Sequence, residues 1–294
     1  MSRICEGRVV IVTGGGRGLG RAHAQALATE GAIVVVNDRG LALDGGTTSA
    51  GSPADTVVAE IRKAGGQAIA SADDISSWDG AGRLVESAIA TFGRLDALVC
   101  NAGNLVDREL ADMSQQDWES VVSTHLNGHA APLHHAAKYW RALATKTGDP
   151  AGGRVVLTTS TAGVWGDGGR ANYNSAKAGI ILLGRTAAIE LAHFGATVNI
   201  IAPFARTRMT ISLDAELAKQ SPGPFDRAAP ENISPLVVWL CSENSADVTG
   251  EVFEIHAGRV GLIEQPRRGP HIDHGGRWDP AELGDAIKQL LESR

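Results

Sequence analysis

Residues 9–20 read Val-Val-Ile-Val-Thr-Gly-Gly-Gly-Arg-Gly-Leu-Gly, an apolar run that passes directly into a glycine-rich turn. The run is typical of a parallel strand covered on both faces. Gly14, Gly18 and Gly20 permit a tight turn, a close approach of backbone to phosphate, and close packing of the helix predicted over 18–30. The free N–H groups at the start of that helix favour a bound pyrophosphate. This stretch therefore predicts a dinucleotide-binding unit.

The same alternation continues along the chain. Further apolar runs predict strands at 33–36, 67–70, 95–99, 155–158, 197–201 and 252–255. Between them, helical periodicity predicts helices near 53–65, 79–92, 114–145, 172–194 and 230–242. This order predicts an α/β fold, a Rossmann-type doubly wound sheet of about seven parallel strands with helices on both faces.

Two segments interrupt this pattern. Residues 40–53 are rich in Gly, Ser and Thr and predict a long loop that is mobile or ordered by a cofactor. Residues 259–278 are polar and irregular, and Asp279-Pro280 then predicts the start of a helix with an apolar face. We assign 1–258 to one domain and 259–294 to a C-terminal extension.

Composition excludes several classes of function. The 294 residues carry 27 Lys and Arg against 33 Asp and Glu, a net charge of −6, which argues against a nucleic-acid partner. No apolar run reaches the length of a membrane span, and no secretory signal is visible at the N-terminus. The three cysteines are widely separated, so we expect a cytoplasmic protein without disulfides.

An acidic residue at the end of the second strand bears on the cofactor. Asp38 follows the glycines by about 20 residues, where a carboxylate accepts the ribose hydroxyls and repels a 2′-phosphate. NAD is therefore the predicted cofactor. Arg17 and Arg39 keep open the alternative of NADP, because they could bind that phosphate.

Residues 160–177 carry the predicted chemistry. Tyr173 and Lys177 lie four positions apart and share one face of a helix. A lysine cation lowers the pKa of a nearby tyrosine, which is otherwise a poor base at neutral pH. Ser160, at the end of the fifth strand, can hold a substrate oxygen beside Tyr173. The sequence therefore predicts proton transfer by Tyr173.

These motifs resemble those of the compact short-chain dehydrogenases/reductases over roughly residues 6–258. The resemblance implies Ser160, Tyr173 and Lys177 as catalytic residues, with His125 at the position of the family's catalytic Asn. We assign the cofactor contacts to Gly14, Arg17, Gly18, Leu19, Gly20, Asp38, Asp74, Ile75, Asn101, Ala102, Gly103, Tyr173, Lys177, Pro203 and Thr207. Cys100 and Phe204 depart from the family pattern, which has Asn and Gly at these positions.

The finer resemblance is to the dehydrogenase unit of peroxisomal multifunctional β-oxidation enzymes and its stand-alone actinobacterial relatives. It rests on residues 34–38, 125–126, 208–210 and 235–241. It implies oxidation of a 3-hydroxyacyl-CoA by a homodimer or homotetramer. The alternatives are another carbonyl, steroid or 3-oxoacyl reductase of the same superfamily, and a dinucleotide-binding protein without catalysis.

Several side chains admit two interpretations. His125 and His129 are spaced for one helix face, but no HExxH-type carboxylate accompanies them, so no metal site is predicted. Trp165, Phe204 and Met209 line a substrate pocket or belong to the core. Arg206 and Arg208 contact an acidic group of the substrate, such as a CoA phosphate, or lie in solvent.

Overall fold

The computed structural model describes residues 3–42, 51–213, 215–219 and 223–293. Most of the loop predicted at 40–53 lies outside these residues. The chain divides into two compact units, Met1–Leu262 and Ile263–Arg294, which are described separately.

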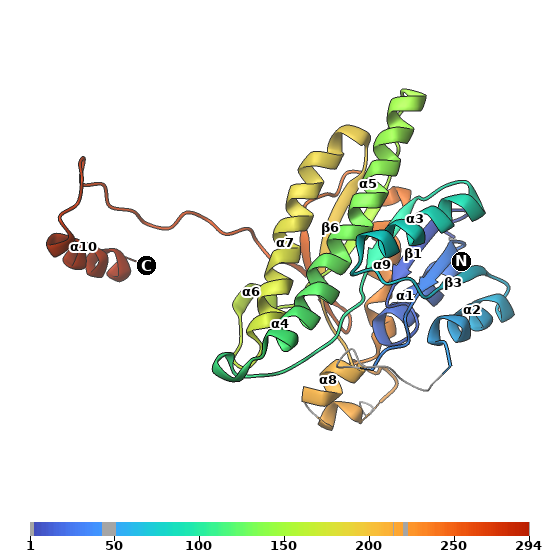
Figure 1. Ribbon diagram of the computed structural model, residues 1–294, viewed down its shortest axis with the longest axis horizontal. Helices are drawn as coiled ribbons and strands as arrows, with labels where there is room; N and C mark the ends of the chain where they lie inside the picture. The colour runs from blue at the N-terminus through green and yellow to red at the C-terminus, as the bar shows by residue number, and fades with distance from the viewer. Residues whose placement is uncertain (1–2, 43–50, 214, 220–222, 294) are drawn as a thin grey trace. The chain divides into compact units, whose positions relative to one another are not determined.

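A sheet of eight strands forms the centre of the described part of the first unit (Figure 1). Its order is β3-β2-β1-β4-β5-β6-β7-β8. The strands are β1 (Val9–Thr13), β2 (Ile33–Asn37), β3 (Gln67–Ser71), β4 (Ala97–Cys100), β5 (Arg154–Thr158), β6 (Thr197–Phe204), β7 (Val252–His256) and β8 (Arg259–Leu262). The order reverses between β1 and β4, which opens a crevice at the carboxyl ends of the strands. The predicted doubly wound α/β class is confirmed.

Helices cover both faces of the sheet because the strands are apolar on both sides. One buried cluster joins β1 and β2 to α1 (Gly18–Thr29), α2 (Pro53–Lys63) and α9 (Ser234–Cys241). The other helices of this unit are α3 (Trp78–Phe92), α4 (Gln115–Val122), α5 (Gly128–Thr147), α6 (Ala162–Trp165), α7 (Ala171–Leu191) and α8 (Arg208–Leu213). Short 3-10 turns lie at Leu110–Asp112, Ala192–Phe194, Ala215–Ala218, Pro230–Asn232 and Glu243–Ser245.

The eighth strand corrects the sequence analysis, which places an irregular segment from Arg259 onward. β8 pairs antiparallel with β7, with Ile255 opposite Val260. Ala257 and Gly258 connect the two strands, and Ala257 has φ +50°. An alanine in the left-handed region is uncommon, so this hairpin lacks the Asn-Gly or Asp-Gly turn signal that would have predicted it.

The prediction of one uninterrupted α-helix over 114–145 is also wrong. A π-helical turn, Ser123–Asn127, separates α4 from α5. Such turns insert a residue into the helical repeat and often mark functional sites. This one carries His125 into the interior of the first unit, where the side chain is 1% exposed.

In the second unit, residues 263–279 form neither helix nor strand. Helix α10 (Pro280–Glu292) follows, and the Asp279 side chain caps it by accepting a hydrogen bond from the Ala281 N–H. Within the part of the chain that the structure describes, no helix is both long and apolar enough to cross a membrane.

Candidate active site

The glycine turn after β1 packs closely against its surroundings. A Cβ on Gly14, which has φ +62°, would lie 2.7 Å from the Cα of Ala102. A Cβ on Gly20 would lie 2.1 Å from the carbonyl oxygen of Gly14. Both positions require glycine, because any side chain would meet backbone. The turn therefore brings the start of α1 to the edge of a cavity lined by Gly14, Arg17 and Gly18.

Asp38, at the end of β2, faces this turn. Its carboxylate accepts hydrogen bonds from the Gly16 N–H at 3.0 Å and the Gly40 N–H at 2.8 Å. Arg39 also lines the cavity and forms an ion pair with Asp74 at 2.7 Å. Asp38 thus supplies a carboxylate to this end of the cavity, and the neighbouring Arg39 is paired with another acid.

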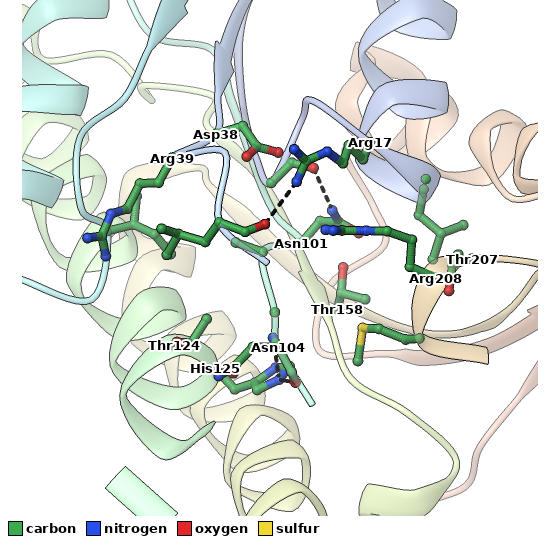
Figure 2. A pocket seen from close by; sticks show the side chains of 18 of the residues that line it. Arg17, Asp38, Arg39, Asn101, Asn104, Thr124, His125, Thr158, Thr207 and Arg208 are labelled. Carbon is green, nitrogen blue, oxygen red and sulfur yellow. Dashed lines mark hydrogen bonds between the residues drawn. The ribbon is translucent and has the colours of Figure 1, made fainter. Parts of the chain in front are cut away.

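Loops after three further strands complete the cofactor side of the cavity (Figure 2). Asp74 and Ile75 follow β3, and Pro203 and Thr207 lie at the end of β6 and before α8. After β4, the Asn101 N–H donates to Thr13 Oγ1 at 3.0 Å, which fixes this loop to the end of β1.

The predicted catalytic side chains meet at the other end of the cavity. Tyr173 and Lys177 line it from α7, and Ser160, in the loop after β5, lies near enough to Tyr173 for its hydroxyl to favour the phenolate. Lys177 Nζ donates to the Thr158 carbonyl at 2.8 Å and lies 5.5 Å from the centroid of the Tyr173 ring. The structure thus brings together a phenol, a hydroxyl and an amine from two elements.

Burial controls the protonation of this group. It raises the pKa of Tyr173, and the neighbouring Ser160 hydroxyl opposes that rise. Burial also lowers the pKa of Lys177 to about 7. The sequence analysis expects a lysine cation to lower the pKa of Tyr173, whereas the net shift in this structure is upward because desolvation outweighs the favourable contacts.

His125 packs against the catalytic tyrosine. Its ring lies edge-on to the Tyr173 ring, with 5.1 Å between the centroids. Its Nε2 contacts the Asn104 carbonyl oxygen at 2.8 Å, so this nitrogen carries the proton. Burial, and secondarily the charge of Lys177, hold the pKa of His125 well below its usual range. His125 is therefore neutral and positions Tyr173 rather than acting as a cation.

Comparison with known proteins identifies the family. The sequence model of the short chain dehydrogenase family matches residues 8–218. The chain belongs to this family. It is 40% identical to the hydroxyacyl-CoA dehydrogenase ChsB1 of Mycobacterium tuberculosis, over 98% of this chain and 90% of that protein. It is also 40% identical to the peroxisomal multifunctional enzyme type 2 of Mus musculus, over 89% of this chain but 33% of that protein.

A solved structure supports the same assignment over nearly the whole chain. The crystal structure of a short chain dehydrogenase from Mycobacterium avium superimposes with a TM-score of 0.88 at 50% sequence identity. The match covers 99% of this chain and 96% of that one. This short-chain dehydrogenase is therefore an oxidoreductase that uses a nicotinamide dinucleotide.

Most residues assigned from the sequence line this cavity, and two do not. Gly20 packs behind the glycine turn, and Ser160 lies beside Tyr173 without lining the cavity. The lining also includes residues that the sequence analysis does not assign to the cofactor or the chemistry: Asn37, Arg39, Leu41, Ala42, Ser76, Asn104, Thr124, Thr158, Thr159, Ala205, Arg208, Met209 and Thr210. They come from loops, strand ends and α8, which tertiary packing brings together. Among them, the sequence had singled out only Arg39, as a possible ligand of a 2′-phosphate, and Arg208 and Met209, through the expected pocket.

The structure distinguishes the remaining residues that were candidates for the substrate pocket: some line the cavity and some do not. Met209 lines the cavity, whereas Trp165 and Phe204 are 76% and 48% exposed and lie outside its lining. Arg206 forms an ion pair with Asp226 and is therefore not available to the substrate.

The histidines do not converge on a common point. His129 accepts a hydrogen bond from the Thr158 N–H, at 3.4 Å, while His125 contacts Asn104. Among the residues that the structure describes, no group of three or more His, Cys, Asp or Glu side chains is placed to hold a metal ion.

Proposed function

We propose that this short-chain dehydrogenase oxidises a 3-hydroxyacyl-CoA to the 3-oxoacyl-CoA, with NAD as the electron acceptor. The observation that carries the proposal is Tyr173 at the end of a glycine-lined cavity, with Lys177 Nζ 5.5 Å from its ring centroid and the Ser160 hydroxyl near enough to lower its pKa. The hydroxyacyl-CoA dehydrogenase named among the relatives supports the substrate class.

The cavity fits a dinucleotide. Gly14 and Gly18 leave its wall without side chains, and Asn101 holds the wall against the end of β1. Asp38 would accept the adenosine ribose hydroxyls and would repel a 2′-phosphate. Because Arg39 is paired with Asp74, it does not offset this repulsion, which supports NAD over NADP.

The residues of the chain handle the proton and orient the substrate. Bound NAD would supply the acceptor for the hydride that leaves C3. Tyr173, as the phenolate, would accept the 3-hydroxyl proton as the C=O bond forms. Ser160 holds the reacting oxygen beside Tyr173, and Lys177 supplies a positive charge on the other side of the phenol. His125 holds the phenol ring from its edge.

An apolar surface beside Tyr173 suits the acyl part of the substrate. Leu105 and Val121 are buried against Tyr173, with Val106 and Met209 packed around them. Apolar contacts of this kind favour a hydrocarbon chain next to the reacting carbon. The distant CoA part would then contribute binding energy that orients this carbon.

The catalytic domain, the assembly and the cellular location of the enzyme follow from the same assignment. We assign catalysis to the domain 1–258 and propose a homodimer or homotetramer, since members of this family are typically oligomeric. A cytoplasmic location is supported by Cys5, Cys100 and Cys241, which are all buried and unpaired.

A substrate panel with NAD tests the proposal. We expect kcat/KM to be highest for a 3-hydroxyacyl-CoA, compared with free secondary alcohols, hydroxysteroids and polyols. The same panel with Tyr173→Phe separates enzymatic turnover from background. If a free alcohol or steroid exceeds every thioester, the acyl-CoA assignment is wrong. If nothing is oxidised although NAD binds, a dinucleotide-binding protein without catalysis is the better description.

A further inference from the structure

Two arginines extend into the cofactor side of the cavity and form no ion pair with any carboxylate among the described residues. Arg17 comes from the glycine turn and Arg208 from the first residue of α8, and both line the cavity. Figure 2 shows both side chains extending toward the middle of the cavity. The chain reaches this place from segments almost 200 residues apart, so the pairing is invisible in the sequence.

The nearby arginines differ from these two. Arg39 pairs with Asp74, and Arg206 pairs with Asp226. Within the described residues, Arg17 donates one hydrogen bond, to the Leu41 carbonyl at 2.9 Å, and Arg208 has neither a hydrogen bond nor an ion pair. Two guanidinium groups therefore lie near one another, and most of their N–H groups donate to no acceptor among the described residues.

The charges around Arg208 favour an anion from outside the chain. Arg17 and burial both lower the pKa of Arg208, while Asp38 raises it. Asp38 does not neutralise the arginines by contact, because its carboxylate is engaged by the N–H groups of Gly16 and Gly40. Guanidinium groups bind phosphate oxygens in a bidentate manner, and a diphosphate offers enough oxygens for two of them.

We propose that Arg208 and Arg17 bind one diphosphate together, and that this diphosphate belongs to the dinucleotide. The inference rests on the proposed cofactor site. The part of the cavity they reach is lined by Gly14, Gly18 and Asp38, whereas the reacting end is lined by Tyr173. A CoA diphosphate is the other source of the same chemistry, and the experiment below distinguishes the two.

A diphosphate bound to Arg208 would also affect the substrate pocket, because Arg208 and a residue of that pocket are neighbours in α8. Met209 follows Arg208 in α8 and packs against the cluster that contains Leu105 and Tyr173. A diphosphate that holds Arg208 therefore also fixes Met209 beside the reacting group. Arg208 thus makes α8 part of the cofactor site, and dinucleotide binding completes the apolar wall of the substrate pocket.

Equilibrium binding to Arg208→Gln tests the proposal with the full-length protein. The ligands are NADH, ADP-ribose, ADP-ribose 2′-phosphate, adenosine and CoA, measured by calorimetry or nicotinamide fluorescence. We expect Arg208→Gln to weaken the binding of NADH and of ADP-ribose by roughly tenfold or more, because the substitution removes charged hydrogen bonds. The affinity for adenosine should not change. Arg208→Lys keeps the charge and should recover part of the affinity. Lys63→Gln removes an exposed charge from α2 and should change none of these values.

Hydrogen exchange supplies a second measurement that is independent of turnover. ADP-ribose should slow exchange in peptides covering α8 in the wild type and in Lys63→Gln, but not in Arg208→Gln. Adenosine should slow it in none of them. Far-ultraviolet circular dichroism of each variant excludes misfolding as the cause.

The failures are distinguishable. If the wild type binds neither NADH nor ADP-ribose, both the proposed function and this inference fail. If it binds both and Arg208→Gln binds them equally well, the inference alone fails. If Arg208→Gln weakens only the binding of CoA, Arg208 belongs to the substrate site. If it weakens only the binding of ADP-ribose 2′-phosphate, Arg208 binds a 2′-phosphate. Either result overturns the proposal.

Discussion

Tyr173 is held in its protonated form by burial and must lose its proton to act as a base. Ser160 lies near its hydroxyl, and both Lys177 and the His125 ring lie close to its ring, at 5.5 and 5.1 Å from the centroid. Because the pKa of Tyr173 is raised, oxidation should be faster at alkaline pH, where more of the phenol is ionised. The residue serves the chemistry and has no part in holding the adenosine end of the cofactor.

Replacing Tyr173 by Phe removes this proton acceptor and keeps the ring. We expect kcat to fall by roughly 100- to 10,000-fold, the usual contribution of a general base. The affinity for NADH, measured by fluorescence titration, should stay within about twofold. The chain has one other tyrosine, Tyr139, and Tyr139→Phe is the matched control that keeps wild-type turnover. A loss of activity explained wholly by failure to bind NADH would refute the role.

Asp38 sets the cofactor preference through its charge. We expect kcat/KM with NAD to exceed that with NADP by about tenfold or more, since an unpaired like-charge contact costs on the order of kcal/mol. Asp38→Ala should narrow the ratio, and exposed Asp247→Ala should not change it. Steady-state kinetics with both cofactors measure the ratio. Equal use of NAD and NADP by the wild type would contradict the prediction.

Among helices and strands, the π-helical turn Ser123–Asn127 has the clearest effect on the site. It directs His125 toward the loop after β4, where a Cβ on Gly103 would lie 2.4 Å from the imidazole ring. The glycine at 103 is therefore required by the histidine that faces it. This contact joins the cofactor loop to the residue that positions Tyr173.

His125→Asn restores the residue more usual in this family. We expect kcat to stay within about tenfold of wild type, because an amide can replace the hydrogen bond of a neutral imidazole with the Asn104 carbonyl. His125→Ala, which can make no such bond, should lose more activity. Turnover is measured alongside circular dichroism. Abolished turnover in a folded His125→Asn would instead make the imidazole essential.

How far the sequence predicts the fold depends on whether a signal is local. The strand, glycine turn and helix at 9–30 form one continuous pattern, and the parallel sheet follows from its repetition. The β7–β8 hairpin and the π-helical turn were missed, because an Ala-Gly connection and a one-residue insertion leave no mark in hydrophobic periodicity. Likewise, only tertiary packing distinguishes Arg206, which pairs with Asp226, from Arg208, which pairs with no carboxylate in the described part of the chain.

At the scale of the whole molecule, buried neutral histidines link stability to pH. Burial lowers the pKa of His23 and of His129 to about 3, below the ordinary value of 6.5. Their stabilising contribution is complete above pH 6.5, and it is lost as pH falls below 6.5 toward the folded-state pKa, because the unfolded chain then binds more protons. At pH 5 the loss is about 2 kcal/mol for each of the two histidines.

We therefore expect the free energy of unfolding to fall steeply between pH 7 and pH 5, as measured by urea denaturation. His23→Gln should lower stability at pH 7, since it removes the contact with Ser234 Oγ, yet reduce the fall on acidification by about 2 kcal/mol. His193→Gln, at an exposed histidine, should reproduce the wild-type fall. An unchanged pH dependence in His23→Gln would show that this histidine binds its proton equally well in the folded and the unfolded protein.

The exposed face of α7 bears on assembly. Leu182 and Ile189 are 65% and 74% exposed and lie seven positions apart, so they share one face of the helix. Ser175, Ala178 and Thr186 lie on the same face, and Arg185, seven positions after Ala178, lies at its edge. An exposed helical face with two large apolar side chains is typical of a surface that packs against another chain. The same helix carries Tyr173 and Lys177, so assembly would also stabilise the catalytic residues.

We accordingly expect a dimer or tetramer with closed symmetry, in which α7 of one copy packs against a second copy. Leu182→Glu places a charge in that interface and should shift the protein toward the monomer in light scattering at micromolar concentration. Leu110→Glu makes the same change at another exposed leucine, 71% accessible, and should leave the mass unchanged. A monomeric wild type would contradict the assembly itself. An unchanged mass in Leu182→Glu would instead place the interface on another surface, because a carboxylate buried without a partner destabilises an apolar contact by several kcal/mol.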